Sequence, residues 1–287
     1  MARPTASSPP TAPVIEITGV GKHFAQRRGT RNVVLEDVNL EVRAGEFVSL
    51  VGASGCGKTT LLRMIAGLAP YQPGAIKVNG QVVRGIPPRI GFVFQDSALL
   101  PWRTIRENVA VGLNEVRGSL SREEARARVD ERLELVGLTD YAEYLPRQVS
   151  GGMQQRTGLA RALVGEPDVL LMDEPFGALD AFTRMRLQEE LGAIVARTSA
   201  TTVFVTHDVD EAVFLSDRIA VMSIGPGTIR EVIDVDLPRP RVSREQLLGN
   251  QQVAALRDHV LELVIGSRAS RNVAPDVPGR EREGVRG

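Results

Sequence analysis

The chain has 287 residues, with 35 acidic and 35 basic side chains and a formal net charge of +0. This balance provides no basic surface of the kind that indicates a nucleic-acid partner. No apolar run approaches the ~18 to 20 residues of a membrane-spanning helix. The single cysteine excludes a disulfide within the chain, which is consistent with a reducing compartment.

The N-terminal part predicts a tail followed by a sheet. Residues 1–13 are rich in Pro, Ser, Thr and Ala and lack the apolar segment of a secretory signal, so we expect a disordered tail. Residues 14–50 alternate apolar and polar positions between polar turns, one of them around Arg27–Gly29. This pattern predicts several short strands in a β-rich edge subdomain. Phe24 lies near the end of the first strand, where it either packs in the core or is available to a ligand.

The first chemical motif lies between a predicted strand at 46–51 and a predicted helix at 60–66. The intervening residues fit G-x-x-x-x-G-K-[ST], whose glycines let backbone N–H groups surround a phosphate at the positive end of a helix. The motif predicts Lys58 on the β- and γ-phosphates of ATP and the Thr59 hydroxyl on Mg²⁺. The predicted nucleotide-binding residues here are Gly52, Ala53, Ser54, Gly55, Cys56, Gly57, Lys58, Thr59 and Thr60.

Cys56 lies inside this loop. We interpret it as a small, tolerated residue, because the chain has no second cysteine to pair with it. The positive helix end predicts a lowered thiol pKa. Alkylation of the thiol would then block nucleotide binding, and ATP would protect it.

A helical segment at about 95–165 interrupts the strand–helix alternation and predicts an inserted lobe. One helix begins at Ile105, and Ser121 with Glu124 forms a capping box for another that ends near Val136. The many charges of the second helix indicate a solvated face. Trp102, the only tryptophan, is either a buried aromatic of this lobe or an exposed edge of an apolar groove.

A second glycine-bearing turn, formed by Ser150, Gly151 and Gly152, precedes a predicted helix at 154–163. Ser150 is a favourable N-cap, and the N-terminus of a helix binds anions. The phosphate loop already surrounds one side of the phosphates. The economical arrangement is therefore a head-to-tail homodimer with two ATP between the chains, in which this turn meets the γ-phosphate bound by Lys58 of the other chain.

Two further strands end in polar residues. The apolar strand at 169–173 ends in Asp173 and Glu174, and the strand at 202–206 is followed by His207. Adjacent residues of a strand point to opposite sides, so the two carboxylates have different tasks. Asp173 suits the Mg²⁺ shell beside Thr59, and Glu174 suits the attacking water as general base or positioner.

The C-terminal part predicts strands at 219–222 and 229–235, a break at 237–241 and a helix at 245–265. The helix is too short for a separate core, so we expect a packing or dimer-stabilising appendage. The expected boundaries are 14–240 for the main domain, 241–266 for the helical extension and 267–287 for a disordered tail.

Taken in order, these motifs resemble the ATP-binding subunit of ABC transporters over most of the chain. The resemblance implies an α/β P-loop NTPase (ABC ATPase) core with an antiparallel β subdomain and an inserted α-helical subdomain. It implies that Phe24 stacks on adenine and that Gln95 senses the γ-phosphate and Mg²⁺. It also implies that His207 is the switch histidine and that Asp180, in the D-loop 177–180, reports across the dimer interface. One departure is Val149, where leucine usually precedes the signature serine. The implied catalytic residues are Glu174, His207, Gln95 and Lys58, and the implied metal ligands are Thr59, Gln95 and Asp173.

Four segments, 94–104, 173–184, 187–191 and 206–218, resemble the nitrate/sulfonate/taurine branch of importers. The resemblance implies a homodimer of ATPase subunits on transmembrane permease subunits, served indirectly by a solute-binding protein. It places the chain at the cytoplasmic side of the inner membrane, with the loop around Trp102 receiving a short permease helix. The alternative is a soluble ABC-type ATPase that acts on nucleic acid or ribosomes. A non-catalytic regulatory subunit conflicts with the intact set of Lys58, Glu174 and His207.

Overall fold

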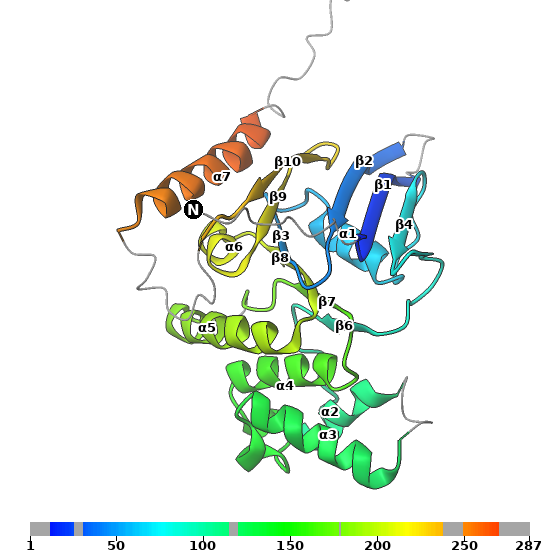
Figure 1. The fold of residues 1–287 in the computed structure, drawn as a ribbon, viewed down its shortest axis with the longest axis vertical. Helices are drawn as coiled ribbons and strands as arrows, with labels where there is room; N and C mark the ends of the chain where they lie inside the picture. Colours follow the sequence, from blue (N-terminus) through cyan, green and yellow to red (C-terminus); the bar gives the residue numbers. More distant parts are fainter. Residues whose placement is uncertain (1–11, 26–30, 115–119, 178, 238–248, 270–287) are drawn as a thin grey trace, which may run out of the picture.

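The computed structural model describes residues 12–25, 31–114, 120–177, 179–237 and 249–269. Most of the predicted N-terminal tail, the turn at 27–29, Ala178 of the D-loop, the break at 238–241 and the last 18 residues lie outside these ranges. Figure 1 shows two sheets in the upper part of the molecule and a helical lobe below them. Among the described residues, no helix combines the length and the apolar character needed to cross a membrane.

The central sheet has six strands in the order β10-β9-β3-β8-β7-β6. All neighbouring pairs are parallel except β9 and β10, which are antiparallel. Strands β3, β7 and β8 are buried along their whole length, which explains their continuous runs of apolar and β-branched residues. The strands are β3 (Phe47–Gly52), β6 (Ile90–Val93), β7 (Val169–Asp173), β8 (Thr201–Thr206), β9 (Arg218–Met222) and β10 (Ile229–Asp234).

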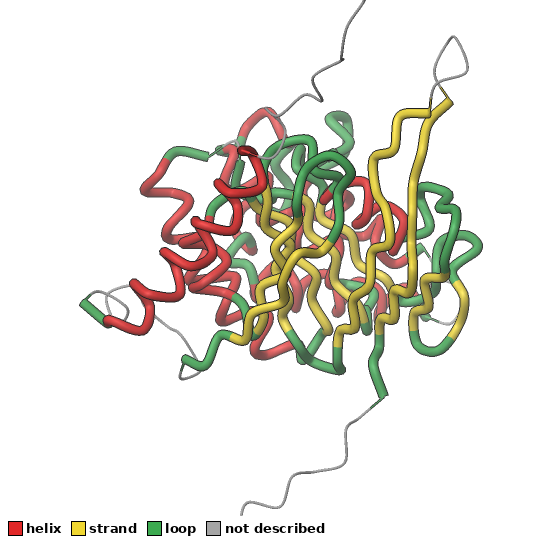
Figure 2. Tube along the Cα trace, turned by 90° about the horizontal axis from the view of Figure 1, so that it is seen from above, coloured by secondary structure: helices red, strands yellow, loops and turns green. Residues whose placement is uncertain are grey.

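The second sheet is antiparallel in the order β2-β1-β4-β5. Its first two strands, β1 (Ile15–Ala25) and β2 (Arg31–Val42), are 11 and 12 residues long. The prediction of several short strands was wrong here. Register shifts between Ile17 and His23 accommodate a polar interruption without ending the strand, and Gly19 contributes a φ of +58°. This long pair projects beyond the other strands at the upper right of Figure 2, and β4 (Ala75–Val78) with β5 (Gln81–Val82) completes the sheet.

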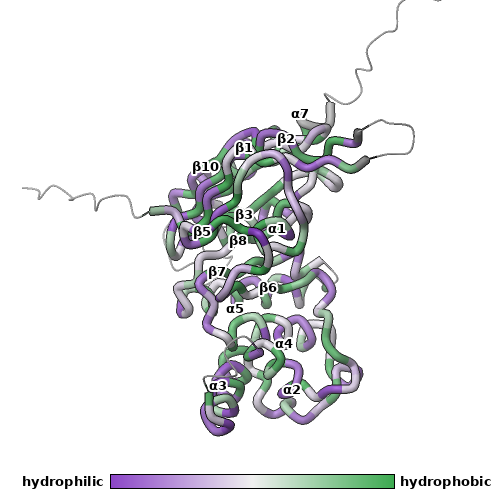
Figure 3. Tube along the Cα trace, turned by 90° about the vertical axis from the view of Figure 1, so that its right-hand side faces the viewer, coloured by the Kyte–Doolittle hydropathy of each residue, from purple (hydrophilic) through white to green (hydrophobic). Residues whose placement is uncertain are grey.

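The helical lobe lies between β6 and β7 in the sequence, as predicted. It contains α2 (Ile105–Ala110), α3 (Arg122–Leu135), α4 (Gly151–Leu163) and three 3₁₀ turns at 111–113, 139–141 and 146–148. The predicted capping box of α3 is confirmed, because Ser121 and Glu124 exchange side-chain-to-backbone hydrogen bonds. Figure 3 shows α3 as a largely hydrophilic helix at the outer end of the lobe, in agreement with a solvated face.

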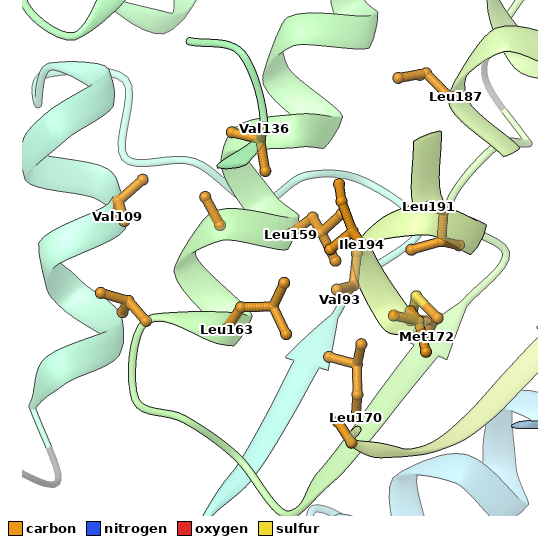
Figure 4. Close-up of a cluster of buried hydrophobic side chains, with 14 of the residues drawn as sticks. Val93, Val109, Val136, Leu159, Leu163, Leu170, Met172, Leu187, Leu191 and Ile194 are labelled. Carbon is orange, nitrogen blue, oxygen red and sulfur yellow. The ribbon is translucent and has the colours of Figure 1, made fainter. Parts of the chain in front are cut away.

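The lobe and the central sheet share one apolar core. Leu159 and Leu163 of α4 lie in the same buried cluster as Val93 of β6 and as Leu170 and Met172 of β7 (Figure 4). Leu191 and Ile194 of α5 (Ala181–Thr198) also belong to this cluster. The remaining core helices are α1 (Lys58–Ile65), which follows β3, and α6 (Val209–Leu215), which follows β8. Helix α4 is therefore packed against the strands that carry the site.

The C-terminal helix α7 spans Gln251–Ala269, six residues later at its start and four later at its end than predicted. Gly249 has a φ of +76°, and the Asn250 side chain accepts a hydrogen bond from the Gln252 amide at 2.9 Å, which sets the start. The predicted start at Glu245 lies outside the described residues. Val260 is fully buried in a cluster with residues of α6 and β9, so α7 is packed on the main domain. Because α7 includes residues 267–269, the predicted boundary of the tail was wrong.

Candidate functional site

The site forms where three neighbouring parallel strands end. Strands β3, β8 and β7 lie side by side, and the phosphate loop, His207 and the Asp173–Glu174 pair follow their carboxyl ends. Parallel strands present their carboxyl ends at the same edge of a sheet, which is where ligands bind in open α/β folds. Topology therefore brings together residues that are far apart in the sequence.

The phosphate loop has the backbone that its motif predicts. Gly55 and Gly57 have φ values of +82° and +100°, which favour glycine. A Cβ at Gly57 would lie only 2.5 Å from Leu35 Cδ2, so this position also requires glycine for space. Lys58 is 5% exposed, and its ammonium donates to the carbonyls of Gly52 at 2.7 Å and Ala53 at 3.3 Å. Both acceptors are neutral, so an anion held in the loop would balance the buried charge.

Thr59 and Asp173 meet as predicted. The Thr59 hydroxyl donates to Asp173 Oδ1 at 2.7 Å, and Asp173 is buried at the end of β7. Burial raises the pKa of this carboxyl, although the hydrogen bond from Thr59 opposes the change. A carboxylate beside a hydroxyl is the hard oxygen set with which proteins bind Mg²⁺ together with phosphates. The residues present thus fit the magnesium ion that the motif implies.

Glu174 and His207 form a second pair at the same edge. His207 Nδ1 lies 3.0 Å from Glu174 Oε2. Glu174 has a φ of +43°, a region that non-glycine residues rarely adopt, and its amide donates to the Val205 carbonyl at 3.0 Å. Backbone held in this way is common where a side chain must be aimed at a reaction. Asp173 is thus paired with Thr59 and Glu174 with His207, and the predicted division of roles between the two carboxylates stays a prediction.

Gln95 approaches the same pair. A Cβ built on Gly177 would lie 3.7 Å from Gln95 Nε2 and 3.8 Å from Glu174 Oε2, so these two side chains flank one glycine. The prediction that Gln95 belongs to the site is therefore supported by its position. Lys58, Thr59, Asp173, Glu174, Gln95 and His207 form one cluster, called the phosphate-side cluster below.

A buried network behind His207 was not predicted. Glu211 of α6 accepts from the Thr206 hydroxyl at 2.6 Å and from Gln188 Nε2 of α5 at 2.7 Å. Thr206 in turn accepts from the Asp208 amide at 3.0 Å. Burial raises the pKa of Glu211. The network fixes the backbone on both sides of His207, and its only sequence signal was polar residues at core positions of α5 and α6.

Phe24 is 51% exposed, which rules out the reading of a core aromatic. The ammonium of Lys22 lies 5.0 Å from the centre of its ring. Both residues belong to β1, whose partner strand β2 carries Leu35 against the phosphate loop at Gly57. The ring is thus available on the sheet that borders the loop, and stacking on adenine stays a prediction.

The second glycine-bearing turn also has its predicted local structure. Ser150 caps α4 by accepting from the Met153 amide at 3.3 Å. A Cβ at Gly151 would lie 3.7 Å from Leu179, and one at Gly152 would lie 3.0 Å from Thr183. Asp180 caps α5 by accepting from the Thr183 amide at 3.0 Å, which lowers the pKa of Asp180. Within the described ranges, no hydrogen bond links this turn to the phosphate-side cluster.

The prediction for the Cys56 thiol was wrong. Its side chain is 1% exposed, and burial raises the pKa of the thiol more than the charge of Lys58 lowers it. The positive helix end is outweighed because the thiolate would lose its hydration. We therefore expect slow alkylation of the folded chain.

Trp102 is 73% exposed, so the reading of a buried aromatic was also wrong. Its loop is held by Asn108 of α2, whose side chain is fully buried. Asn108 accepts from the Leu100 amide at 2.7 Å and donates to the carbonyls of Leu100, Arg103 and Thr104 at 2.9 to 3.1 Å. The exposed ring therefore stands on an ordered loop.

The fold and the phosphate-side cluster define the class of P-loop nucleoside-triphosphate-binding proteins, here with a second glycine-bearing turn on an inserted lobe. Residues 35–177 match the model of the ABC transporter family. The chain is 45% identical over 267 residues to the nitrate import ATP-binding protein NrtD of Synechococcus elongatus, covering 91% of this chain and 96% of NrtD. The chain belongs to the family of ABC transporter ATP-binding proteins.

Two other relatives show the breadth of the match. The aliphatic sulfonates import ATP-binding protein SsuB of Bacillus cereus is 46% identical over 228 residues, which are 79% of this chain and 88% of SsuB. The bicarbonate transport ATP-binding protein CmpC of Synechococcus elongatus is 45% identical over 248 residues, or 86% of this chain. The match spans only 37% of the length of CmpC.

The fold comparison agrees with the sequence. The ATP-binding cassette MJ0796, solved as a dimer in a post-hydrolysis state bound to ADP and Pi, matches with a TM-score of 0.69 and 32% identity. The match covers 78% of this chain and all of the MJ0796 chain. The α/β P-loop core with its antiparallel β subdomain and inserted helical subdomain is thereby confirmed.

Proposed function

We propose that this chain is the ATP-hydrolysing, energy-coupling subunit of a multi-subunit ABC importer. The observation that carries the proposal is the phosphate-side cluster, which joins a phosphate loop, an oxygen site for Mg²⁺ and the Glu174–His207 pair at one sheet edge. Such an arrangement suits phosphoryl transfer, where catalysis consists mainly of positioning and charge neutralisation.

Each residue of the cluster has a distinct role in this proposal. Lys58 and the loop amides hold the β- and γ-phosphates of ATP, and Phe24 stacks on adenine. Thr59, Asp173 and Gln95 would hold Mg²⁺, which would supply positive charge to neutralise the phosphates. Glu174 positions the attacking water and accepts its proton, and His207 orients Glu174 and steadies the γ-phosphate. The 3.0 Å contact between His207 and Glu174 supports this pairing.

The proposed assembly is a homodimer of these subunits on two transmembrane permease subunits. Ser150 caps the start of α4 and leaves the positive end of the helix available to a phosphate, which supports a site completed by a second chain. The exposed Trp102 on an ordered loop supports docking of a permease segment. The chain then lies at the cytoplasmic side of the inner membrane and meets a solute-binding protein only indirectly.

We propose that the solute is a small anion of the nitrate, sulfonate or taurine type. The relatives reported above are named for the transport of nitrate, aliphatic sulfonates and bicarbonate. The head groups of these solutes are all small oxyanions. None of the relatives named above is named for an action on nucleic acid, which would favour the alternative, and the chain carries no excess of basic residues.

The test uses cells that lack this chain, complemented with the wild type or with Glu174→Gln. Growth is followed with nitrate as sole nitrogen source, and with taurine or an alkanesulfonate as sole sulfur source. We expect the wild type alone to restore growth on one of these. Equal growth of all strains on every source would contradict the solute class, while ATP hydrolysis by the purified chain would test the enzymatic role separately.

A further inference from the structure

Helix α4 contacts two functional parts of the molecule. Its N-terminus carries the turn of Ser150, Gly151 and Gly152. Its apolar side, with Leu159 and Leu163, packs into the core shown in Figure 4. Two polar side chains of the same helix, Gln155 and Arg161, reach the segment that follows β6.

These two side chains hold three carbonyls among four consecutive residues. Gln155 Nε2 donates to the Gln95 carbonyl at 2.9 Å. Arg161 donates through Nη2 to the Ser97 carbonyl at 2.6 Å and through Nη1 to the Ala98 carbonyl at 2.8 Å. Ala98 has a φ of +46°, so the clamp fixes a backbone conformation that alanine rarely adopts by itself.

The clamp uses an arginine that is partly buried. Burial lowers the pKa of Arg161. Among the described residues, no carboxylate forms an ion pair with its guanidinium. Partial burial of a charge without a counter-ion is unfavourable for folding. The planar fork, however, can hold two carbonyls in a fixed geometry, which a lysine cannot do.

The clamped segment continues directly into the Trp102 loop. Residues 95–98 are held by α4, and residues 100–104 are held by Asn108 of α2. Gln95, at the start of the segment, lies beside Glu174 across Gly177. The segment therefore forms a continuous ordered connection from the phosphate-side cluster, past α4, to an exposed ring.

We propose that Gln155 and Arg161 are positioning residues that transmit the state of the Ser150–Gly152 turn, through α4, to the Trp102 loop. A phosphate bound at the turn displaces α4 as a rigid helix, and the two side chains move the carbonyls of residues 95–98 with it. The inference rests on the proposed function, because the phosphate at this turn belongs to ATP held by a second copy of the chain.

Trp102 is the only tryptophan, so its fluorescence reports on this loop alone. The experiment uses the full chain with Glu174→Gln, in which Mg·ATP is expected to hold the dimer closed. Dimer formation is measured by sedimentation and the Trp102 emission is recorded in the same samples. Arg161→Gln and the milder Arg161→Lys are compared with Arg132→Gln. Arg132 is a matched control. Its guanidinium donates to the carbonyl of Leu163, the last residue of α4, and it forms no described hydrogen bond with residues 95–98.

We expect Mg·ATP to shift the Trp102 emission of the parent and of the Arg132→Gln variant. In both Arg161 variants the shift per dimer formed is expected to fall at least about twofold, as for residues that couple two sites. If an Arg161 variant dimerises and its Trp102 emission shifts as much as that of the parent, the proposed transmission through α4 is wrong, while the proposed function stands. The same conclusion follows if the parent dimerises and its Trp102 emission does not change. Failure of the parent to dimerise with ATP would instead contradict the proposed function, and the link with it.

Discussion

The glycine-bearing turns before α1 and α4 differ in what surrounds them. The turn before α1 has two glycines with positive φ, a Lys58 that is almost fully buried and Asp173 against Thr59. The turn before α4 has an ordinary serine cap, exposed to solvent, and its glycines lie beside apolar or hydroxyl side chains of α5 and of Leu179, which precedes α5.

This difference favours the proposal that one turn is a complete site and the other is half of one. The phosphate loop has the Lys58 ammonium, the proposed metal ligands Thr59 and Asp173, and two glycines with positive φ within one chain. The Ser150 turn offers a positive helix end without a counterpart of its own. A site of the second kind gains its function when another chain supplies the phosphate. Four substitutions test this comparison.

The largest effect is expected for Glu174→Gln, which leaves both turns intact. Hydrolysis should fall by roughly 10²- to 10⁴-fold, the usual contribution of a general base. ATP affinity should be retained, because neither turn changes, and the closed dimer should accumulate. Turnover and ATP binding of the purified chain are measured beside Glu123→Gln, which removes an exposed carboxylate of α3. If the Glu174→Gln variant hydrolysed ATP as fast as the wild type, Glu174 would not be the general base.

Lys58→Ala tests the complete turn. The ammonium makes charge-assisted contacts with phosphate, and bonds of this type contribute about 1.5–3 kcal/mol. ATP binding should therefore weaken by about ten- to a hundredfold or more. Binding is measured by titration calorimetry with Lys77→Ala as control, since Lys77 pairs with Glu16 on the other sheet. Unchanged ATP affinity would refute the assignment of the loop.

Ser150→Ala tests the half-site. Loss of the cap should destabilise α4 by about 1 kcal/mol, while ATP affinity of the single chain should stay unchanged because the phosphate loop is intact. Dimerisation of the Glu174→Gln chain by ATP should weaken by at least about fivefold, as expected for a change of that size. If the single Ser150→Ala chain also bound ATP more weakly, the Ser150 turn would contribute to ATP binding within one chain, and the distinction between the two turns would be wrong.

The smallest effect concerns Glu211, which supports His207 and thereby the complete site. Burial raises its pKa above the ordinary 4.5, so the folded chain binds a proton at a higher pH than the unfolded chain. This stabilises the wild type below the raised pKa, and the contribution is lost as the pH rises through it. Glutamine does not titrate. The melting temperature of Glu211→Gln relative to wild type should therefore rise from about pH 5 to pH 8. A difference in melting temperature that does not change with pH would contradict this assignment.

The sequence predicted much of this site because its signals are local. The glycine spacing before Lys58, the carboxylates at the end of β7 and the serine before α4 each define a strand end or a helix start within a few residues. The capping box at Ser121 is predictable for the same reason. Errors arose where burial decided the result: the Cys56 thiol is governed by loss of hydration, and the exposure of Trp102 depends on how Asn108 folds the loop.

The sequence by itself thus determined the family and most of the order of the elements, and it predicted the residues proposed to face the phosphates, since each rests on short-range spacing. Only the tertiary structure decided which polar side chains support them. Gln188 reaches Glu211 across 23 residues, and Arg161 reaches the carbonyls of Ala98 and Ser97 across 63 and 64 residues. Such partners are selected by the packing of α4, α5 and α6 on the sheet, because a buried donor must find an acceptor wherever the fold places one.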